Sequence, residues 1–221
     1  MGYLCSSGRE PDISFNWPSG RSSRSPVSAL DSSNEVVRAI KARRNAIKLS
    51  AERPVSREMI ETVLEAAIWA PNHHLTEPWR FVVISGDERK RLGDAIADAM
   101  LSTPANPPPS PEMVERERLR PLTAPVVIAA ISSPDQEKGG VAQEELVAGG
   151  AALQNLLLAA HSIGLGTKLK TGAYSYSKVI RGFLKMKDSE SLISFVYLGF
   201  AEGEAKPGKR MGIEGKVDWR S

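Results

Sequence analysis

The sequence has 221 residues, of which 41% are hydrophobic and 25% charged, and its formal net charge is +3. A chain of this length can bury one substantial core, and these fractions are those of ordinary globular proteins rather than of disordered or fibrous ones. The positive charges alternate with acidic residues, and aromatic residues make up only 6%, so we expect no nucleic-acid partner.

The beginning of the chain differs in composition from the rest. It is rich in Ser, Gly, Pro and Arg and has no apolar periodicity, so we predict a poorly ordered leader over residues 1–32 and a single domain over residues 33–221. The leader lacks the apolar core of a secretory signal, which favours a cytoplasmic protein, with import into an organelle as the alternative. The single cysteine, Cys5, excludes an internal disulfide and a cysteine-based metal site. No apolar stretch approaches the roughly 20 residues of a membrane span, so we expect no membrane partner.

The first predicted elements are two helices and a strand. A helix should begin at Ser33, whose hydroxyl would cap it, and close with Arg43 and Arg44. The next helix should be capped by Ser56 and run to Pro71, because apolar residues recur at helical spacing between them. Residues 80–85, Arg-Phe-Val-Val-Ile-Ser, predict a strand.

The second half of the chain mixes helices and strands without strict alternation. The patterns predict helices over 87–101, 144–163 and 175–184, strands over 125–131 and 192–200, a strand or loop over 165–171, and a proline-rich surface loop over 103–111. The pair Gly149-Gly150 inside the long helix indicates either close approach of a backbone or flat ligand, or ordinary helix packing. This order of elements favours an α+β fold over a doubly wound nucleotide fold.

The first candidate binding motif is Arg43-Arg44-Asn45. Two guanidiniums followed by an amide offer charge-assisted and neutral hydrogen bonds that suit a phosphate and a sugar chain. The alternative is structural, because arginines in a last helical turn also complement the helix dipole.

The second motif is Trp69-Ala70-Pro71-Asn72-His73-His74, where a helix stops and a loop leads to the next strand. Such a loop can present imidazoles and backbone groups to a ligand. Adjacent side chains usually point apart and no third ligand stands at a suitable spacing, so we expect a histidine that contacts a cofactor or solvent and no metal site.

The third motif, residues 164–172, is glycine-rich and basic. It lacks the P-loop spacing, and neither a dinucleotide fingerprint nor a serine nucleophile elbow accompanies it. Phosphate-binding features without a visible acid, base or nucleophile are typical of a protein whose cofactor carries the reaction.

In this order, Arg43-Arg44-Asn45, Ala70-Pro71-Asn72-His73 with Pro78-Trp79-Arg80-Phe81, residues 164–172 and Tyr197-Leu198-Gly199 resemble the nitroreductase family, and within it the compact bacterial NAD(P)H nitroreductases. The resemblance covers roughly residues 35–200. It implies a three-layer α+β sandwich with a mainly antiparallel central sheet, and a homodimer with FMN at the interface.

The resemblance also implies the cofactor contacts. The residues that match FMN contacts of the family are Arg43, Arg44, Asn45, Trp69, His73, Leu169, Lys170 and Thr171. Those that match nicotinamide contacts are Ala159, Ala160, His161, Ser162, Ile163 and Gly164. Asn45 replaces a family Ser and Lys170 a family Arg; the lysine lacks a bidentate fork and would weaken or reshape the phosphate site.

The implied activity is ping-pong redox chemistry. NAD(P)H would pass a hydride to the flavin N5, and a small electron-poor acceptor such as a nitroaromatic or quinone would then take the electrons, with no side chain acting as catalytic acid or base. Other flavin chemistry on the same fold, such as dehalogenation or ene reduction, and a non-catalytic flavin-binding protein are the alternatives.

Overall fold

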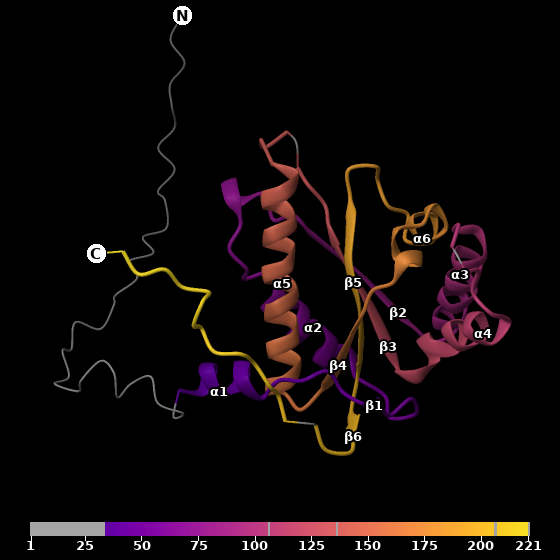
Figure 1. The fold of residues 1–221 in the computed structure, drawn as a ribbon, viewed down its shortest axis with the longest axis horizontal. Helices are drawn as coiled ribbons and strands as arrows, with labels where there is room; N and C mark the ends of the chain where they lie inside the picture. Colours follow the sequence, from indigo (N-terminus) through magenta and orange to yellow (C-terminus); the bar gives the residue numbers. More distant parts are fainter. Residues whose placement is uncertain (1–33, 106, 136, 206, 221) are drawn as a thin grey trace, which may run out of the picture.

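The protein is described by a computed structural model over residues 34–105, 107–135, 137–205 and 207–220. The predicted leader lies outside the described residues. Figure 1 shows the elements, which in chain order are α1 (Glu35–Ala42), β1 (Lys48–Leu49), α2 (Arg57–Ala67), η2 (His73–Leu75), β2 (Trp79–Ser85), α3 (Glu88–Ser102), α4 (Pro111–Leu119), η3 (Arg120–Thr123), β3 (Val126–Ser132), α5 (Ala142–Ser162), β4 (Gly166–Lys170), η4 (Ala173–Tyr176), α6 (Lys178–Phe183), β5 (Ser191–Gly199) and β6 (Ala201–Glu202).

The main sheet has four strands in the order β2-β3-β5-β4, and each neighbouring pair is antiparallel. A smaller antiparallel pair joins β1 to β6. The order leaves β2 and β4 at the edges of the main sheet. The predicted α+β class is therefore confirmed.

Helices cover both faces of this sheet, with α2 and α5 on one side and α3, α4 and α6 on the other (Figure 1). The central strand β3 is buried along its whole length. Because successive strand residues point to opposite faces, its side chains feed two separate cores. On the α2/α5 side lie Val126, Ile128 and Ala130; on the α3/α6 side lie Val127, Ala129 and Ile131. This is the three-layer sandwich that the resemblance implies.

The capping of α1 differs from the prediction. Asn34, rather than Ser33, is the N-cap: its Oδ1 accepts hydrogen bonds from the N–H groups of Val36 and Val37. An amide oxygen caps as well as a hydroxyl, so the two neighbouring residues were equivalent in sequence. The helix also ends at Ala42, so Arg43 and Arg44 follow it instead of forming its last turn.

The other predicted helix and strand boundaries agree with the structure to different degrees. Ser56 caps α2 as predicted, accepting from the Met59 N–H at 3.3 Å. The helix predicted over 175–184 is present but begins three residues later, because Ser177 is extended and caps α6 after the separate 3₁₀ segment η4. Helix α4 was not predicted, and the open choice over 165–171 is settled as a strand, β4.

The glycine pair in α5 has a packing role at one position. A Cβ built on Gly149 would lie 2.6 Å from Ile193 Cδ1. Nothing lies within 4 Å of a Cβ built on Gly150. Within the described chain, ordinary packing against a side chain therefore explains Gly149, and Gly150 meets open space.

One buried ion pair ties β2 to the turn before β5. Arg80 Nε and Nη2 each lie 2.8 Å from an oxygen of Glu190, whose side chain is only 1% exposed. Burial alone would raise the pKa of Glu190, but hydrogen bonds from Arg80, the Lys187 N–H and Ser133 hold that pKa below its usual value. This ion pair therefore anchors β2 to the turn that precedes β5.

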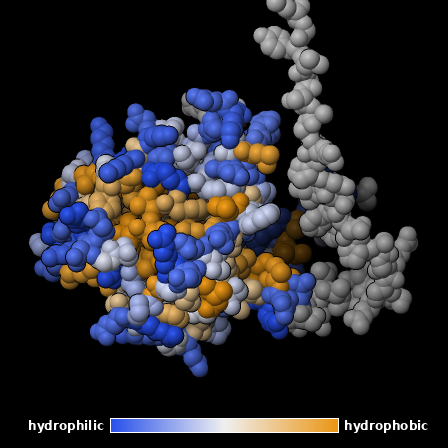
Figure 2. All heavy atoms as spheres, turned by 180° about the vertical axis from the view of Figure 1, so that it is seen from behind, coloured by the Kyte–Doolittle hydropathy of each residue, from blue (hydrophilic) through white to orange (hydrophobic). Residues whose placement is uncertain are grey.

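The outer surface mixes polar and apolar residues. Figure 2 shows hydrophobic residues gathered across the middle of the face turned away in Figure 1, with hydrophilic residues around them. None of the helices in the described ranges is long and apolar enough to cross a membrane.

Candidate functional site

The arginine motif lines a pocket beside the end of α5. Arg43 and Arg44 stand between α1 and β1, and the pocket has a volume of about 260 Å³. Its wall also contains His161, Gly164 and Thr167. The first and third sequence motifs are therefore brought together, although more than a hundred residues separate them in the chain.

The pocket concentrates positive charge. Arg43 Nη1 and Arg44 Nε are buried and have no hydrogen-bond partner among the described residues. Burial, followed by the charges of Arg44 and Arg210, lowers the pKa of Arg43. A buried donor without a partner costs free energy, and like charges repel. An anion bound in this pocket would relieve both penalties.

Two acidic residues also line the pocket and leave this charge in place. Glu202 forms an ion pair with Lys48, whose Nζ lies 2.6 Å from a carboxylate oxygen of Glu202. No ion pair joins Glu204 to either arginine in the part of the chain that the structure describes. Neither Arg43 nor Arg44 therefore has its positive charge balanced by an acidic side chain of the described residues.

Asn45 joins the arginine motif to the edge strand β4. It forms an isolated parallel bridge with Thr167, and its Oδ1 accepts a hydrogen bond from the Leu169 N–H at 3.4 Å. The next residue, Ala46, donates its N–H to the Thr167 carbonyl at 2.8 Å. The amide nitrogen of Asn45 is a donor that a ligand along β4 can use. On this outer edge of β4 the Thr167 carbonyl and the Leu169 N–H are already paired, so a ligand can reach only the rest of the strand's backbone from outside the sheet.

The segment that matches nicotinamide contacts forms the last turn of α5 and the turn after it. Of its residues, His161 and Gly164 line the arginine pocket. Ala160 is fully buried in the α2/α5 core, and the Ser162 hydroxyl donates to the Ala159 carbonyl at 2.8 Å. Within one chain only part of this segment therefore faces a ligand.

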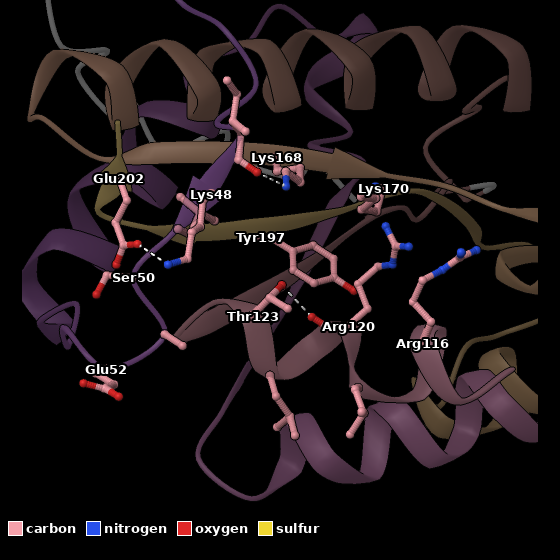
Figure 3. Close-up of a pocket in the computed structure, with 15 residues that line it drawn as sticks. Lys48, Ser50, Glu52, Arg116, Arg120, Thr123, Lys168, Lys170, Tyr197 and Glu202 are labelled. Carbon is pink, nitrogen blue, oxygen red and sulfur yellow. Dashed lines mark hydrogen bonds and ion pairs between the residues drawn. The ribbon is translucent and has the colours of Figure 1, made fainter. Parts of the chain in front are cut away.

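Lys170 and Thr171 lie at the other end of β4 and do not line the arginine pocket. From Gly166 to Lys170 the strand extends about 13 Å at roughly 3.3 Å per residue. Lys170 instead lines a larger hollow of about 890 Å³ (Figure 3), and with Thr171 it lines a neighbouring one of about 460 Å³. The expectation that Lys170 offsets the same phosphate as the arginines is therefore not supported by its position.

Trp69 and His73 belong to a surface loop beside the first turn of α5. Trp69 is 85% exposed. His73 Nδ1 lies 3.3 Å from Glu144 Oε2, and both side chains are half exposed. The rings of His73 and His74 do not point apart as expected, since their centroids are 3.9 Å apart. His74 has a left-handed backbone conformation with φ 52°. No group of metal-ligating side chains is found among the described residues.

The same loop is held firmly despite its unusual backbone. Leu75 and Glu77 also have positive φ values, 52° and 49°, which are strained for residues other than glycine. The Thr76 hydroxyl lies 2.8 Å from an oxygen of the buried Glu145 and 3.0 Å from the His73 carbonyl. These contacts fix the loop to α5, so the strain is maintained by the surrounding structure.

The second motif is far from the other two within one chain. His73 contacts Glu144 near the beginning of α5, whereas the arginine pocket includes His161 near its end. At 1.5 Å per residue, α5 rises about 25 Å between these positions. A single chain therefore brings together the first and third motifs and keeps the second apart.

Some residues of the site had no recognisable sequence signal. Arg210 lies in the C-terminal tail, and its positive charge, after burial and the charge of Arg44, helps to lower the pKa of Arg43. Gly208 contacts the Arg44 guanidinium so closely that a Cβ would collide with it. Arg116 and Arg120, which face Lys170, lie on α4 and η3, where no binding motif occurs.

Comparison with known sequences shows which proteins this chain resembles. The model of the Nitroreductase family matches residues 40–200. A candidate NAD(P)H nitroreductase from Escherichia coli, YdjA, is 26% identical over 157 residues, which cover 71% of this chain and 83% of YdjA. Nitrobenzene nitroreductase from Ectopseudomonas oleovorans is 25% identical over 197 residues, covering 73% of this chain and 85% of that protein.

Comparison with solved structures shows the same resemblance. A nitroreductase-like protein from Bacillus cereus superposes with a TM-score of 0.70 at 24% identity, covering 83% of this chain and 95% of that one. A candidate nitroreductase from Desulfovibrio desulfuricans in complex with FMN gives a TM-score of 0.62 at 26% identity, covering 80% and 92%.

Proposed function

The chain belongs to the nitroreductase family, and on that basis we propose that it is an FMN-dependent oxidoreductase that takes electrons from NAD(P)H and passes them to a small electron-poor acceptor. When bound, FMN supplies the redox chemistry, receiving a hydride from the nicotinamide in one half-reaction and releasing electrons to the acceptor in the next. The observation that carries the proposal is a pair of buried donors beside β4, Arg43 Nη1 and Arg44 Nε, which have no hydrogen-bond partner among the described residues.

The arginine pocket fits the phosphate of FMN. Arginine forks match phosphate geometry, and the buried Nη1 of Arg43 and Nε of Arg44 are donors that lack acceptors among the described residues. Arg210 adds a third positive charge close to Arg43. The protein's contribution at this end is to bind and orient the cofactor.

The ring of FMN would extend along β4 toward Lys170 and Thr171. The strand spans about 13 Å between the arginine pocket and Lys170, a distance suited to the sugar chain and ring of the cofactor. Asn45 stands beside the path and can donate to the sugar chain. In this arrangement Lys170 is near the ring rather than the phosphate, so replacement of the family arginine changes the surroundings of the ring.

Two copies of the chain would complete each site. His73 and the arginine pocket lie about 25 Å apart along α5, and FMN is shorter than that. Large hydrophobic side chains also stand exposed near the second motif: Ile68, Trp69, Leu75, Leu146 and Val147. Burying such a surface favours association. We propose a homodimer in which Trp69 and His73 of one subunit face the FMN bound by the other.

A mixing experiment tests this division of the site. One chain carries Arg43→Ala with Arg44→Ala, and the other carries Trp69→Ala with His73→Ala. Each variant alone should retain little FMN. A symmetric dimer formed from both chains has one intact site and one doubly damaged site, so random mixing should restore FMN to about a quarter of all sites.

Tagged chains that are unfolded and refolded together, then assayed for bound flavin, give the measurement. The unmixed variants treated in the same way are the controls. If both motifs served the same site within one chain, mixing would restore nothing, and the proposed dimer would be wrong.

The proposed activity is tested by separating its two half-reactions. Without oxygen, NADH or NADPH should bleach the flavin absorbance of the purified protein, and a quinone or nitroaromatic added afterwards should restore it. Steady-state double-reciprocal plots at several acceptor concentrations should be parallel. Reduction by NAD(P)H without reoxidation by either acceptor class would favour other flavin chemistry, and no reduction would favour a non-catalytic flavin-binding protein.

A further inference from the structure

A second hollow adjoins the arginine pocket and has a different character. It has a volume of about 890 Å³ and lies between β1, β4 and the α4–η3 segment (Figure 3). Ile47 and Glu202 line both this hollow and the arginine pocket, so the two are neighbours. Its apolar lining is provided by Ile47, Leu49, Leu119 and Leu122. The apolar part of a ligand can therefore pack against these four side chains.

Charge in this hollow is divided between its two ends. Figure 3 shows Glu52 and Glu202 near Lys48 at one end, and Arg116 and Arg120 pointing toward the strand that carries Lys170 at the other. Lys48 and Glu202 form an ion pair at 2.6 Å. Glu202 is thus paired with a cation at its own end of the hollow, and the opposite end is positive.

The positive end has more cations than its acid can balance. Glu117 contacts Arg120 and lies 3.7 Å from Arg116, so one carboxylate faces two guanidiniums. Lys170 has no ion pair in the described ranges. Burial, followed by the charges of Arg120 and Lys168, lowers the pKa of Lys170, with Glu117 acting in the opposite direction.

Two buried donors at this end lack acceptors. The hydroxyl of Tyr197 and Nε of Arg120 are both buried without a hydrogen-bond partner among the described residues. Tyr197 is 1% exposed, lines the hollow, and directs its hydroxyl toward Arg120 (Figure 3). Burial raises the pKa of Tyr197, so the phenol stays protonated and can donate. An anionic oxygen placed here would satisfy donors that otherwise remain unpaired.

We propose that this hollow binds the electron acceptor and selects aromatic molecules that carry a carboxylate. The carboxylate would accept hydrogen bonds from Arg116, Arg120 and the Tyr197 hydroxyl, and the ring would pack against the leucines. The proposal rests on the proposed oxidoreductase function, because it assigns the acceptor class of that site.

Binding of a compound that cannot be reduced tests the site apart from activity. Calorimetric titration of the full-length FMN-loaded protein with benzoate and with neutral benzamide should show benzoate binding at least about tenfold more tightly, as expected for charge-assisted hydrogen bonds. Arg116→Gln and Arg120→Gln should each remove most of this preference, and Tyr197→Phe should reduce it. Arg91→Gln is the matched control, because Arg91 is an exposed α3 residue paired with Glu88 at 2.7 Å.

Arg116 is the safer test variant, since its side chain is 64% exposed and its loss should not unfold the protein. In turnover, Arg116→Gln should lower the ratio of kcat/KM for 4-nitrobenzoate to kcat/KM for nitrobenzene about tenfold, with the FMN content unchanged. The relative use of NADPH and NADH should also stay constant. A changed NADPH preference with unchanged carboxylate selection would assign the positive end to the nicotinamide phosphate and overturn the inference.

The possible failures are distinguishable. Preferential benzoate binding that Arg116→Gln removes, without turnover of any acceptor, supports the anion site and contradicts the proposed activity. Equal binding of benzoate and benzamide, with turnover of nitrobenzene, overturns the inference and leaves the proposed function standing. Benzoate binding that disappears when FMN is added would show that the hollow belongs to the flavin itself, which also overturns it.

Discussion

Replacing Arg43 and Arg44 together by alanine should raise the dissociation constant for FMN about 100- to 10,000-fold. Each arginine would contribute a charge-assisted hydrogen bond of roughly 1.5–3 kcal/mol, and every 1.4 kcal/mol corresponds to a factor of ten. Loss of both guanidiniums should leave the purified protein nearly colourless. Fluorescence titration of the apoprotein with FMN measures the change.

Arg38→Ala is the matched control for this experiment. Arg38 lies on α1, is largely exposed, and is 3.8 Å from Glu35, so its removal should leave FMN affinity unchanged. The single variant Arg44→Ala should have an intermediate effect. If the double variant retained FMN as tightly as the control, the arginines would have a structural role only and the phosphate would bind elsewhere.

Arg80→Ala should lower the free energy of unfolding by about 3–5 kcal/mol, because it leaves a buried carboxylate without its cation. Glu190 would keep the hydrogen bonds from Ser133 and the Lys187 N–H and lose both from Arg80. Urea denaturation of the wild-type protein and of Arg80→Ala at pH 7 measures this loss in the free energy of unfolding. Arg91→Ala, which breaks an exposed ion pair, should cost at most about 1 kcal/mol.

The effect of Arg80→Ala should depend on pH. The folded protein holds the pKa of Glu190 below its usual value. The stability from this carboxylate is therefore present above the unfolded pKa, about 4.3, and is lost as the pH falls through the lower folded value. The difference in the free energy of unfolding between the wild-type protein and Arg80→Ala should shrink as the pH falls. Glu190 becomes protonated at a higher pH in the variant, because it has lost its cation. A difference that stayed constant from pH 7 to pH 3 would assign the loss to packing alone.

The central elements of the fold were predictable because their hydrophobic patterns are strong. The continuous apolar run of β3 and the helical spacing in α2 each specify one type of element. Helix α4 is largely polar, and only its beginning carried a signal: Ser110 as N-cap followed by Pro111 at the first position. The break at Ser177 was missed because its neighbours on both sides are compatible with a helix.

The site was predictable in its parts and not in its arrangement. The motif around Arg43 and the strand ending at Lys170 do meet, through Asn45. The sequence could not show that α5 separates His73 from them, because that distance depends on tertiary packing. Nor could it reveal Tyr197 and Arg120 as neighbours, since each reads alone as an ordinary strand or helix residue. Chemistry assembled from distant elements leaves no spacing pattern in the chain.

The most direct test of the account is the absorbance spectrum of the purified protein under anaerobic NAD(P)H. We predict a yellow protein with about one FMN per chain, as expected for a symmetric dimer with two equivalent sites. Its visible absorbance should disappear on addition of NADH or NADPH. A colourless protein that cannot be reconstituted with FMN, or a bound flavin that neither nucleotide reduces, would contradict the central claim.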